Sequence, residues 1–144
     1  MRFMKKTAVV YWSGTGNTQA MAEAVLEGAQ SAGAQAELFT AAEFTADNAN
    51  SYDTFAFGCP SMGAEQLEES EFEPMFSDVL PHLSGKSVGL FGSYGWGDGE
   101  WMRSWTQQCT DAGCRLIGDS VICNDAPDDE ALENCRALGA ACGA

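Results

Sequence analysis

The sequence predicts an α/β fold in which a doubly wound, five-stranded parallel sheet forms the middle of three layers. Five short apolar runs, rich in β-branched and aromatic residues, alternate along the chain with segments whose apolar residues recur at helical spacing. The runs are continuously apolar, which is typical of parallel strands that helices cover on both faces. A chain of 144 residues is long enough for one such domain, and we expect it to span residues 1–144.

The first half of the chain begins with a strand predicted at Thr7–Trp12. The glycine-rich turn Ser13–Thr18 follows, and a helix is predicted to begin near Gln19. It is expected to end at Gly33, because glycine readily adopts the left-handed conformation that closes helices. A second strand is predicted at Ala36–Phe39, and the polar segment after it is predicted to be a loop with a short helix.

The third and fourth strands are predicted at Thr54–Gly58 and Val88–Gly92. Pro60 ends the pairing of the third strand, since proline has no N–H to donate to a sheet. Between the two strands, apolar residues at helical spacing predict a helix over Phe72–Leu83. Pro74 is compatible with the first turn of this helix.

The last third of the chain begins with a loop predicted at Ser93–Gly99 and a helix that ends at Gly113. A fifth strand is predicted within Arg115–Ile122, split by an irregularity at Gly118-Asp119. The final helix is predicted from about Asp128, with a buried face that contains Leu132, Cys135, Leu138, Gly139 and Cys142.

The net charge of −14 argues against nucleic acids and anionic membranes as partners, because both carry negative charge. No run reaches the roughly 18–20 apolar residues of a membrane span, and no cleavable leader is evident, so a cytoplasmic location is expected. Six cysteines lie within predicted helices and strands, without C-x-x-C spacing, and His82 does not complete a zinc set. We expect reduced thiols that pack as small apolar groups, and no metal.

Three unusual loops follow the first, third and fourth predicted strands, at Ser13–Thr18, Pro60–Glu65 and Ser93–Gly99. In doubly wound sheets, ligands bind beyond the carboxyl ends of the strands, near the point where the strand order reverses. Because the strands are parallel, these three loops should converge at one rim. The sequence therefore predicts a single ligand site there.

The loop Ser13–Thr18 offers hydroxyl and amide side chains, together with free N–H groups at the start of a helix, which suit a phosphate. It lacks the lysine of a nucleoside-triphosphate loop and the third glycine of a dinucleotide loop. A monophosphate held by neutral donors fits it better. Taken alone, the segment is also compatible with an ordinary glycine-rich turn between a strand and a helix.

The other two loops carry candidate contacts for a flat ring. Tyr94 and Trp96 lie among glycines, and an exposed indole beside free backbone N–H groups is a platform for a heteroaromatic ring. Met62 offers a thioether for the opposite face, and Glu65 offers an acceptor for a ring N–H. The alternatives are that Trp96 and Met62 fill the core.

Together these loops resemble those of the flavodoxin family, in its short-chain clostridial-type branch. The residues that carry the resemblance are Ser13–Thr18, Gly58–Glu65 and Gly89–Trp101, with Asn124–Pro127 before the last helix. The resemblance runs essentially from end to end. It implies a flavodoxin-like fold with strand order 2-1-3-4-5 and a non-covalently bound FMN.

The resemblance also implies a set of FMN-binding residues. Trp96 would stack on the outer face of the flavin and Met62 on the inner face, while Glu65 would accept from N3–H. The amides of Gly95 and Trp96 would face the pyrimidine oxygen. The complete implied set is Ser13, Gly14, Thr15, Gly16, Asn17, Thr18, Pro60, Ser61, Met62, Gly63, Ala64, Glu65, Ser93, Tyr94, Gly95, Trp96, Gly97 and Asn124.

The resemblance also implies the function of a low-potential one-electron carrier, which shuttles mainly between semiquinone and hydroquinone and replaces ferredoxin-type carriers. It would turn over no substrate of its own. Because Gly63 has no Cβ, its peptide can rotate and offer a carbonyl to flavin N5–H. The alternatives are an FMN-dependent reductase with a nicotinamide donor, and a signalling domain of the same fold. The signalling reading requires an acidic phospho-acceptor after the first strand, where this chain has Ser13.

Acidic residues cluster near the predicted rim, with five carboxylates between Glu65 and Glu73, followed by Asp98, Glu100 and Asp128–Glu130. We expect them to form a collar that docks basic redox proteins onto a monomer. The alternative is that they are solvated residues at helix starts, where carboxylates complement the helix dipole.

Overall fold

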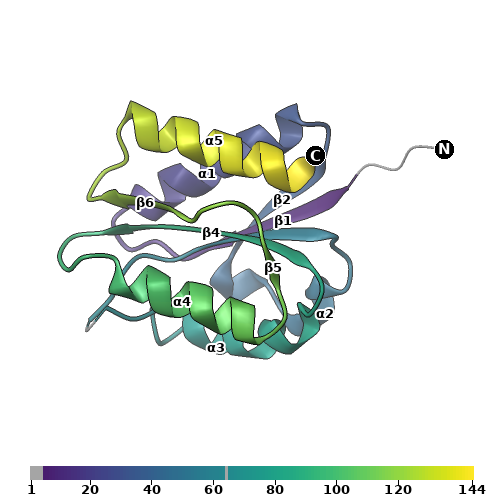
Figure 1. The fold of residues 1–144 in the computed structure, drawn as a ribbon, viewed down its shortest axis with the longest axis horizontal. Helices are drawn as coiled ribbons and strands as arrows, with labels where there is room; N and C mark the ends of the chain where they lie inside the picture. The colour runs from purple at the N-terminus through teal and green to yellow at the C-terminus, as the bar shows by residue number, and fades with distance from the viewer. Residues whose placement is uncertain (1–4, 64) are drawn as a thin grey trace.

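The computed structural model of the chain describes residues 5–63 and 65–144, and a parallel sheet forms its middle layer (Figure 1). The strand order is β2-β1-β3-β4-β5, and β6 also pairs with β4. The pairings between these strands are parallel. The predicted fold class and strand order are confirmed. The strands are β1 (Lys6–Tyr11), β2 (Gln35–Thr40), β3 (Thr54–Gly58), β4 (Ser87–Tyr94), β5 (Arg115–Leu116) and β6 (Val121–Asn124).

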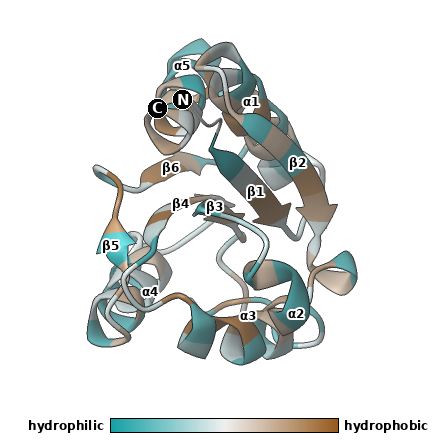
Figure 2. Cartoon of the chain, turned by 90° about the vertical axis from the view of Figure 1, so that its right-hand side faces the viewer, coloured by the Kyte–Doolittle hydropathy of each residue, from teal (hydrophilic) through white to brown (hydrophobic). Residues whose placement is uncertain are grey.

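Helices cover both faces of the sheet and complete the three layers. Figure 2 shows α1 (Asn17–Ser31) and α5 (Asp129–Gly143) on one side. On the other side lie α2 (Ala46–Ala49), α3 (Phe72–Val79) and α4 (Glu100–Asp111). Two short 3₁₀ helices, η1 (Ala41–Glu43) and η2 (Leu80–His82), complete the elements.

The two sides of the sheet have different packing. On the α3–α4 side, the aromatic rings of Phe57 and Phe76 are 5.2 Å apart, and those of Phe76 and Trp105 are 5.7 Å apart. On the other side, α1 and α5 approach so closely that a Cβ at Gly139 would lie 1.9 Å from the carbonyl oxygen of Val25. Large rings therefore fill one layer, whereas backbone contact joins the helices of the other.

Two predicted boundaries at the rim are corrected. Helix α1 begins at Asn17 rather than near Gln19, so Asn17 and Thr18 belong to its first turn. Strand β4 extends beyond Gly92 through Ser93 and Tyr94, which pair with Cys123 and Asn124 of β6. The glycines that follow Tyr94 made this stretch resemble a loop, while the partner strand that extends β4 lies some 30 residues further on.

The predicted break in the fifth strand is confirmed, because β5 and β6 pair with successive parts of β4. The helix predicted over Phe72–Leu83 is shorter than expected: α3 ends at Val79 and the chain continues in η2. The expectation of packed thiols is also confirmed: the six cysteines are free and all but the half-buried Cys123 are buried. In the described part of the chain, no helix is both long and apolar enough to cross a membrane.

Candidate functional site

The three predicted loops converge at the carboxyl ends of the strands. The parallel register places Tyr11 beside Gly58, and Gly58 beside Phe91, so β1, β3 and β4 reach the rim together. Backbone hydrogen bonds then link the segments beyond the strands: the N–H of Trp12 donates to the carbonyl of Gly58 at 3.0 Å. The N–H of Ser61 donates to the carbonyl of Ser93, also at 3.0 Å.

The loop after β1 is a cradle of hydrogen-bond donors at the start of α1. Gly16 has φ +97°, a left-handed conformation that glycine adopts without strain. The N–H groups of Gly16 and Gln19 converge on the hydroxyl oxygen of Ser13, at 3.1 and 3.2 Å. The N-cap residue Gly16 has no side chain to cap α1, so the dipole and the first N–H groups of the helix face this loop.

Thr18 is an unusual residue of this cradle. Its side chain is buried, and within residues 5–63 and 65–144 its hydroxyl has no hydrogen-bond partner. An unpartnered buried hydroxyl is costly, which suggests that a ligand is its partner. Gly14 and Thr15 are exposed beside it, and the segment Ser13–Thr18 contains no lysine or arginine. These neutral donors fit a monophosphate group such as that of FMN.

The loop after β3 is a tight turn with its tip toward solvent. Met62 and Gln66 exchange two backbone hydrogen bonds of 2.8 and 2.9 Å. Gly63 and Glu65 both have left-handed backbones, with φ +52° and +53°, and Met62 is 36 % exposed. The predicted site residue Ala64 lies outside the described residues. Met62 is therefore at the surface and is not core filler.

Glu65 joins this turn to the third loop. Its Oε1 accepts a hydrogen bond of 2.9 Å from the N–H of Glu100, the first residue of α4. A Cβ at Gly97 would lie only 2.4 Å from the carboxyl carbon of Glu65. The lack of a side chain at residue 97 thus leaves the space in which the Glu65 carboxylate sits.

The segment after β4 presents an aromatic side chain to solvent. Trp96 is 65 % exposed, so the alternative in which it fills the core is wrong. Tyr94 instead packs inward, with its ring centroid 5.5 Å from that of Trp101. Asn124, at the end of β6, pairs with Tyr94 and is exposed at the same rim.

Asp125 holds the base of this segment; the sequence placed it in the stretch before the last helix but predicted no role for it. Its carbonyl accepts a hydrogen bond of 2.6 Å from the Ser93 hydroxyl, and its N–H donates to the carbonyl of Tyr94 at 2.8 Å. Asp125 has φ +57°, a conformation in which Asp and Asn are enriched. The Asn-Asp pair directly after a strand was the available signal for this turn.

Glu68 is a second residue that the sequence analysis did not single out, and it anchors the loop that carries Met62 and Glu65. Its buried carboxylate accepts from the N–H groups of Ser70, Glu71 and Phe72, at 2.8 to 2.9 Å, and from the Ser70 hydroxyl. Desolvation raises the pKa of Glu68, but these hydrogen bonds outweigh it and lower that pKa. Glu68 thus belongs to the start of α3 and not to a solvated collar.

Replacing Glu68 with glutamine is expected to lower the free energy of unfolding by about 1–3 kcal/mol at pH 7, because several N–H donors lose a charged acceptor. The folded-state pKa is below the unfolded one, so the carboxylate stabilises the fold above the unfolded-state pKa. This contribution disappears as the pH falls through the folded-state pKa. Urea unfolding of the unmodified protein and of Glu68→Gln between pH 7 and pH 3 should show that the difference between their free energies of unfolding becomes smaller as the pH falls. A difference independent of pH would contradict this role.

The exposed carboxylates near the rim include Glu69, Glu71 and Glu73 around the start of α3. Glu71 also accepts a hydrogen bond of 2.9 Å from the indole N–H of Trp12. Arg103 pairs with Asp98 and Glu100 at 2.9 and 2.7 Å. His82 is exposed in η2, which precedes the amino end of β4, so it lies at the opposite end of the sheet from the rim.

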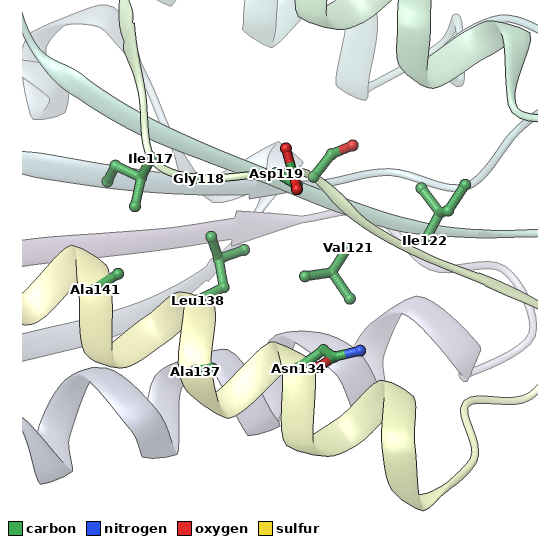
Figure 3. A pocket seen from close by; sticks show the side chains of 10 residues that line it. Ile117, Gly118, Asp119, Val121, Ile122, Asn134, Ala137, Leu138 and Ala141 are labelled. Carbon is green, nitrogen blue, oxygen red and sulfur yellow. The ribbon is translucent and has the colours of Figure 1, made fainter.

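A cavity of about 450 Å³ lies away from this rim, between α5 and the segment that joins β5 to β6 (Figure 3). Leu138 and Val121 face each other across it, and Asn134 projects from α5. In the described ranges, no three His, Cys, Asp or Glu side chains lie close enough together to hold a metal ion.

Comparison with known proteins identifies the family. The flavodoxin family model matches residues 9–139. The chain is 47 % identical to flavodoxin of Megasphaera elsdenii, over 92 % of this chain and 95 % of that protein, and 42 % identical to flavodoxin of Clostridium beijerinckii, over 91 % and 94 %. The solution structure of two-electron reduced Megasphaera elsdenii flavodoxin superposes with a TM-score of 0.87 at 48 % identity, and covers 95 % of this chain and 98 % of that one. The chain therefore belongs to the flavodoxin family of FMN-binding electron-transfer proteins.

Proposed function

We propose that this flavodoxin is a low-potential one-electron carrier, which cycles its FMN mainly between semiquinone and hydroquinone and replaces ferredoxin-type carriers. The observation that supports this proposal best is the cradle at Ser13–Thr18, which contains no lysine or arginine and in which the buried Thr18 hydroxyl has no partner among the described residues. Bound FMN supplies the one-electron chemistry, and the protein tunes it through charge and hydrogen bonds. Extra negative charge on a reduced flavin is disfavoured near carboxylates and near a phosphate without a basic partner.

The proposed roles of the rim residues follow from their positions. Ser13, Thr15, Asn17 and Thr18 hold the phosphate through hydroxyl, amide and backbone N–H groups. Ser93 was expected to add a further hydroxyl, but its hydroxyl donates to the carbonyl of Asp125, so its role is to hold the base of the third loop. Gly14 and Gly16 let the backbone approach it. Pro60 and Ser61 lead from β3 into the turn at Met62–Glu65.

The two faces of the ring are assigned to two exposed apolar side chains. Trp96, 65 % exposed, covers the outer face, and Met62, 36 % exposed, covers the inner one. Gly63 is at the exposed tip of its turn, where its peptide is free to rotate and offer a carbonyl to the flavin edge. The N–H groups of Gly95 and Trp96 border the ring from the third loop, and Asn124 borders it from the end of β6.

The position of Glu65 gives a direct test of these roles. We expect Gly97→Ala to weaken FMN binding at least tenfold, because the new Cβ would displace the Glu65 carboxylate, to which it would come within 2.4 Å. The hydrogen bond that would be lost joins the Glu65 carboxylate to the N3–H of the flavin. A hydrogen bond to a charged group contributes about 1.5–3 kcal/mol, which corresponds to at least a tenfold change in affinity. Gly33→Ala is the matched control: Gly33 has φ +96° against +88° for Gly97, but a Cβ there meets nothing within 4 Å.

Titration of each apoprotein with FMN, followed by flavin fluorescence, measures the two dissociation constants. Both variants carry the same kind of backbone strain, so only Gly97→Ala should bind FMN more weakly than the unmodified chain. Equal affinities of the two variants would contradict the assignment of Glu65.

The proposed partners are basic redox proteins that dock onto a monomer at the rim. This proposal is supported by the net charge of −14 and by the exposed carboxylates Glu69, Glu73 and Asp128–Glu130, which lie around the starts of α3 and α5. Steady oxidation of a nicotinamide nucleotide by the isolated protein would instead favour an FMN-dependent reductase and contradict the carrier proposal.

A further inference from the structure

Helix α4 ends in a turn that brings two cysteines together. Gly113 has φ +88°, and its N–H donates to the carbonyl of Thr110 at 3.1 Å. The N–H of Cys114 donates to the carbonyl of Cys109 at 3.0 Å. These two hydrogen bonds define a Schellman motif, which is frequently accompanied by a side-chain contact between the two positions that Cys109 and Cys114 occupy here.

The geometry of this turn suits a disulfide bond. With standard bond lengths, a 3.0 Å hydrogen bond from the N–H of Cys114 to the carbonyl of Cys109 places the two Cα atoms at most about 7 Å apart. Disulfides usually span about 4.4–6.8 Å between Cα atoms. Both side chains are buried in the same apolar cluster, and each thiol shifts the pKa of the other, so the two thiols are neighbours.

Packing alone does not explain a pair of thiols at this turn. Helix α1 ends in the same motif: the N–H of Gly33 donates to the carbonyl of Gln30 at 3.0 Å, and that of Ala34 to the carbonyl of Ala29 at 3.1 Å. There the corresponding pair consists of two buried alanines. The motif therefore needs two small apolar side chains, and sulfur adds chemistry that this packing does not require.

We propose that Cys109 and Cys114 form a dithiol–disulfide site that a small-molecule disulfide oxidises reversibly. The thiolate of Cys114 attacks the small disulfide RSSR, which forms a mixed disulfide and releases one RS⁻. Cys109 then loses its proton and attacks the sulfur of Cys114, which releases the second thiolate and closes the intrachain bond. In total, two protein thiols are oxidised and RSSR is reduced to two RSH.

The two cysteines differ in a way that fixes the order of these steps. Interaction with the Cys109 thiol lowers the pKa of Cys114, whereas interaction with Cys114 and burial raise the pKa of Cys109. Cys114 is 9 % exposed and Cys109 is fully buried. Cys114 is therefore the attacking thiol and Cys109 the resolving one.

The other cysteines have a different environment. Burial raises the pKa values of Cys59, Cys135 and Cys142 to about 12. Burial also raises the pKa of Cys123, whose sulfur lies 3.6 Å from that of Met21. Because the thiolate is the reactive form, we expect a small-molecule disulfide to react selectively with Cys114, whose pKa is lowered.

The site is remote from the FMN rim. Cys114 precedes Arg115, which pairs with Ser87 at the amino end of β4, whereas the rim lies beyond the carboxyl end of that strand. The proposal therefore does not depend on the function proposed above.

Treatment of the FMN-loaded protein with oxidised glutathione tests the proposal by peptide mass analysis. Trypsin cleaves after Arg103 and Arg115, and the peptide 104–115 contains Cys109 and Cys114 and no other cysteine. We expect this peptide to lose two hydrogen atoms, and dithiothreitol to restore them. No reaction, a lasting glutathione adduct on this peptide, or a bond to another cysteine would each overturn the proposal.

Two variants separate the roles of the thiols. Cys109→Ala should retain glutathione on Cys114, because the resolving thiol is absent. Cys114→Ala should take up no glutathione on Cys109. Uptake at Cys109 in the second variant would contradict the proposed order, and the measurement on the unmodified protein remains decisive if either variant folds poorly.

Discussion

Gly139→Val is expected to lower the free energy of unfolding by about 3 kcal/mol, the largest stability effect that we predict for one substitution. A Cβ at Gly139 would lie 1.9 Å from the carbonyl oxygen of Val25, and one at Gly28 would lie 1.9 Å from that of Arg136. Both contacts are with backbone atoms of the facing helix, which cannot rotate away as a side chain can. The helices α1 and α5 must therefore separate, and the apolar contacts between them are lost.

Ala137→Val is the matched control for this substitution. Ala137 lies on the same helix, two residues before Gly139, but on its exposed side. Both variants introduce the same β-branched residue, so the difference between them isolates the contact between α1 and α5. Urea unfolding, followed by circular dichroism, measures the free energy of unfolding of each variant. If both variants lost the same stability, the close approach of the two helices would be refuted.

Thr18→Val is expected to weaken FMN binding by about 10–100-fold, because it removes a hydroxyl from the phosphate cradle while the size of the side chain is nearly unchanged. Hydrogen bonds to charged groups contribute about 1.5–3 kcal/mol, which corresponds to that range. The apoprotein should respond in the opposite direction. In the described part of the chain, the Thr18 hydroxyl is buried without a partner, so its removal should raise the stability of the apoprotein.

The two effects of Thr18→Val distinguish a ligand-binding hydroxyl from a structural one. FMN titration of the apoprotein gives the affinity, and thermal unfolding without FMN gives the stability. Thr110→Val is the control. Thr110 also lies in a helix, but it is exposed and far along the chain from the cradle, and its hydroxyl already donates to the carbonyl of Thr106 at 3.0 Å. Unchanged FMN affinity in Thr18→Val would show that this hydroxyl does not reach the phosphate.

Much of the fold was predictable because the signals that specify it are local. Continuous apolar runs predicted β1 and β3 to within one residue, and Gly33 and Gly113 marked the ends of α1 and α4. The carboxyl end of β4 was not predictable in this way. Ser93 and Tyr94 are held in the strand by β6, which lies some 30 residues further along the chain.

The loops of the site were predictable from their composition, but the residues that hold them in place were not. Trp96 between two glycines indicated an exposed ring, and the structure places it in solvent. Glu68 instead appeared as one of five carboxylates in an acidic stretch. Only the folded loop shows that its carboxylate is buried against the N–H groups of residues 70–72, because the donors that it meets depend on the path of the backbone.

Stepwise reduction of the FMN-loaded protein with dithionite, followed by its absorption spectrum, tests the central claim most directly. If the rim at Gly63, Glu65 and Trp96 makes this chain a one-electron carrier, a blue one-electron-reduced flavin should accumulate after the first electron and disappear with the second. Direct conversion of the oxidised flavin to the fully reduced form, with no intermediate at any point of the titration, would contradict it.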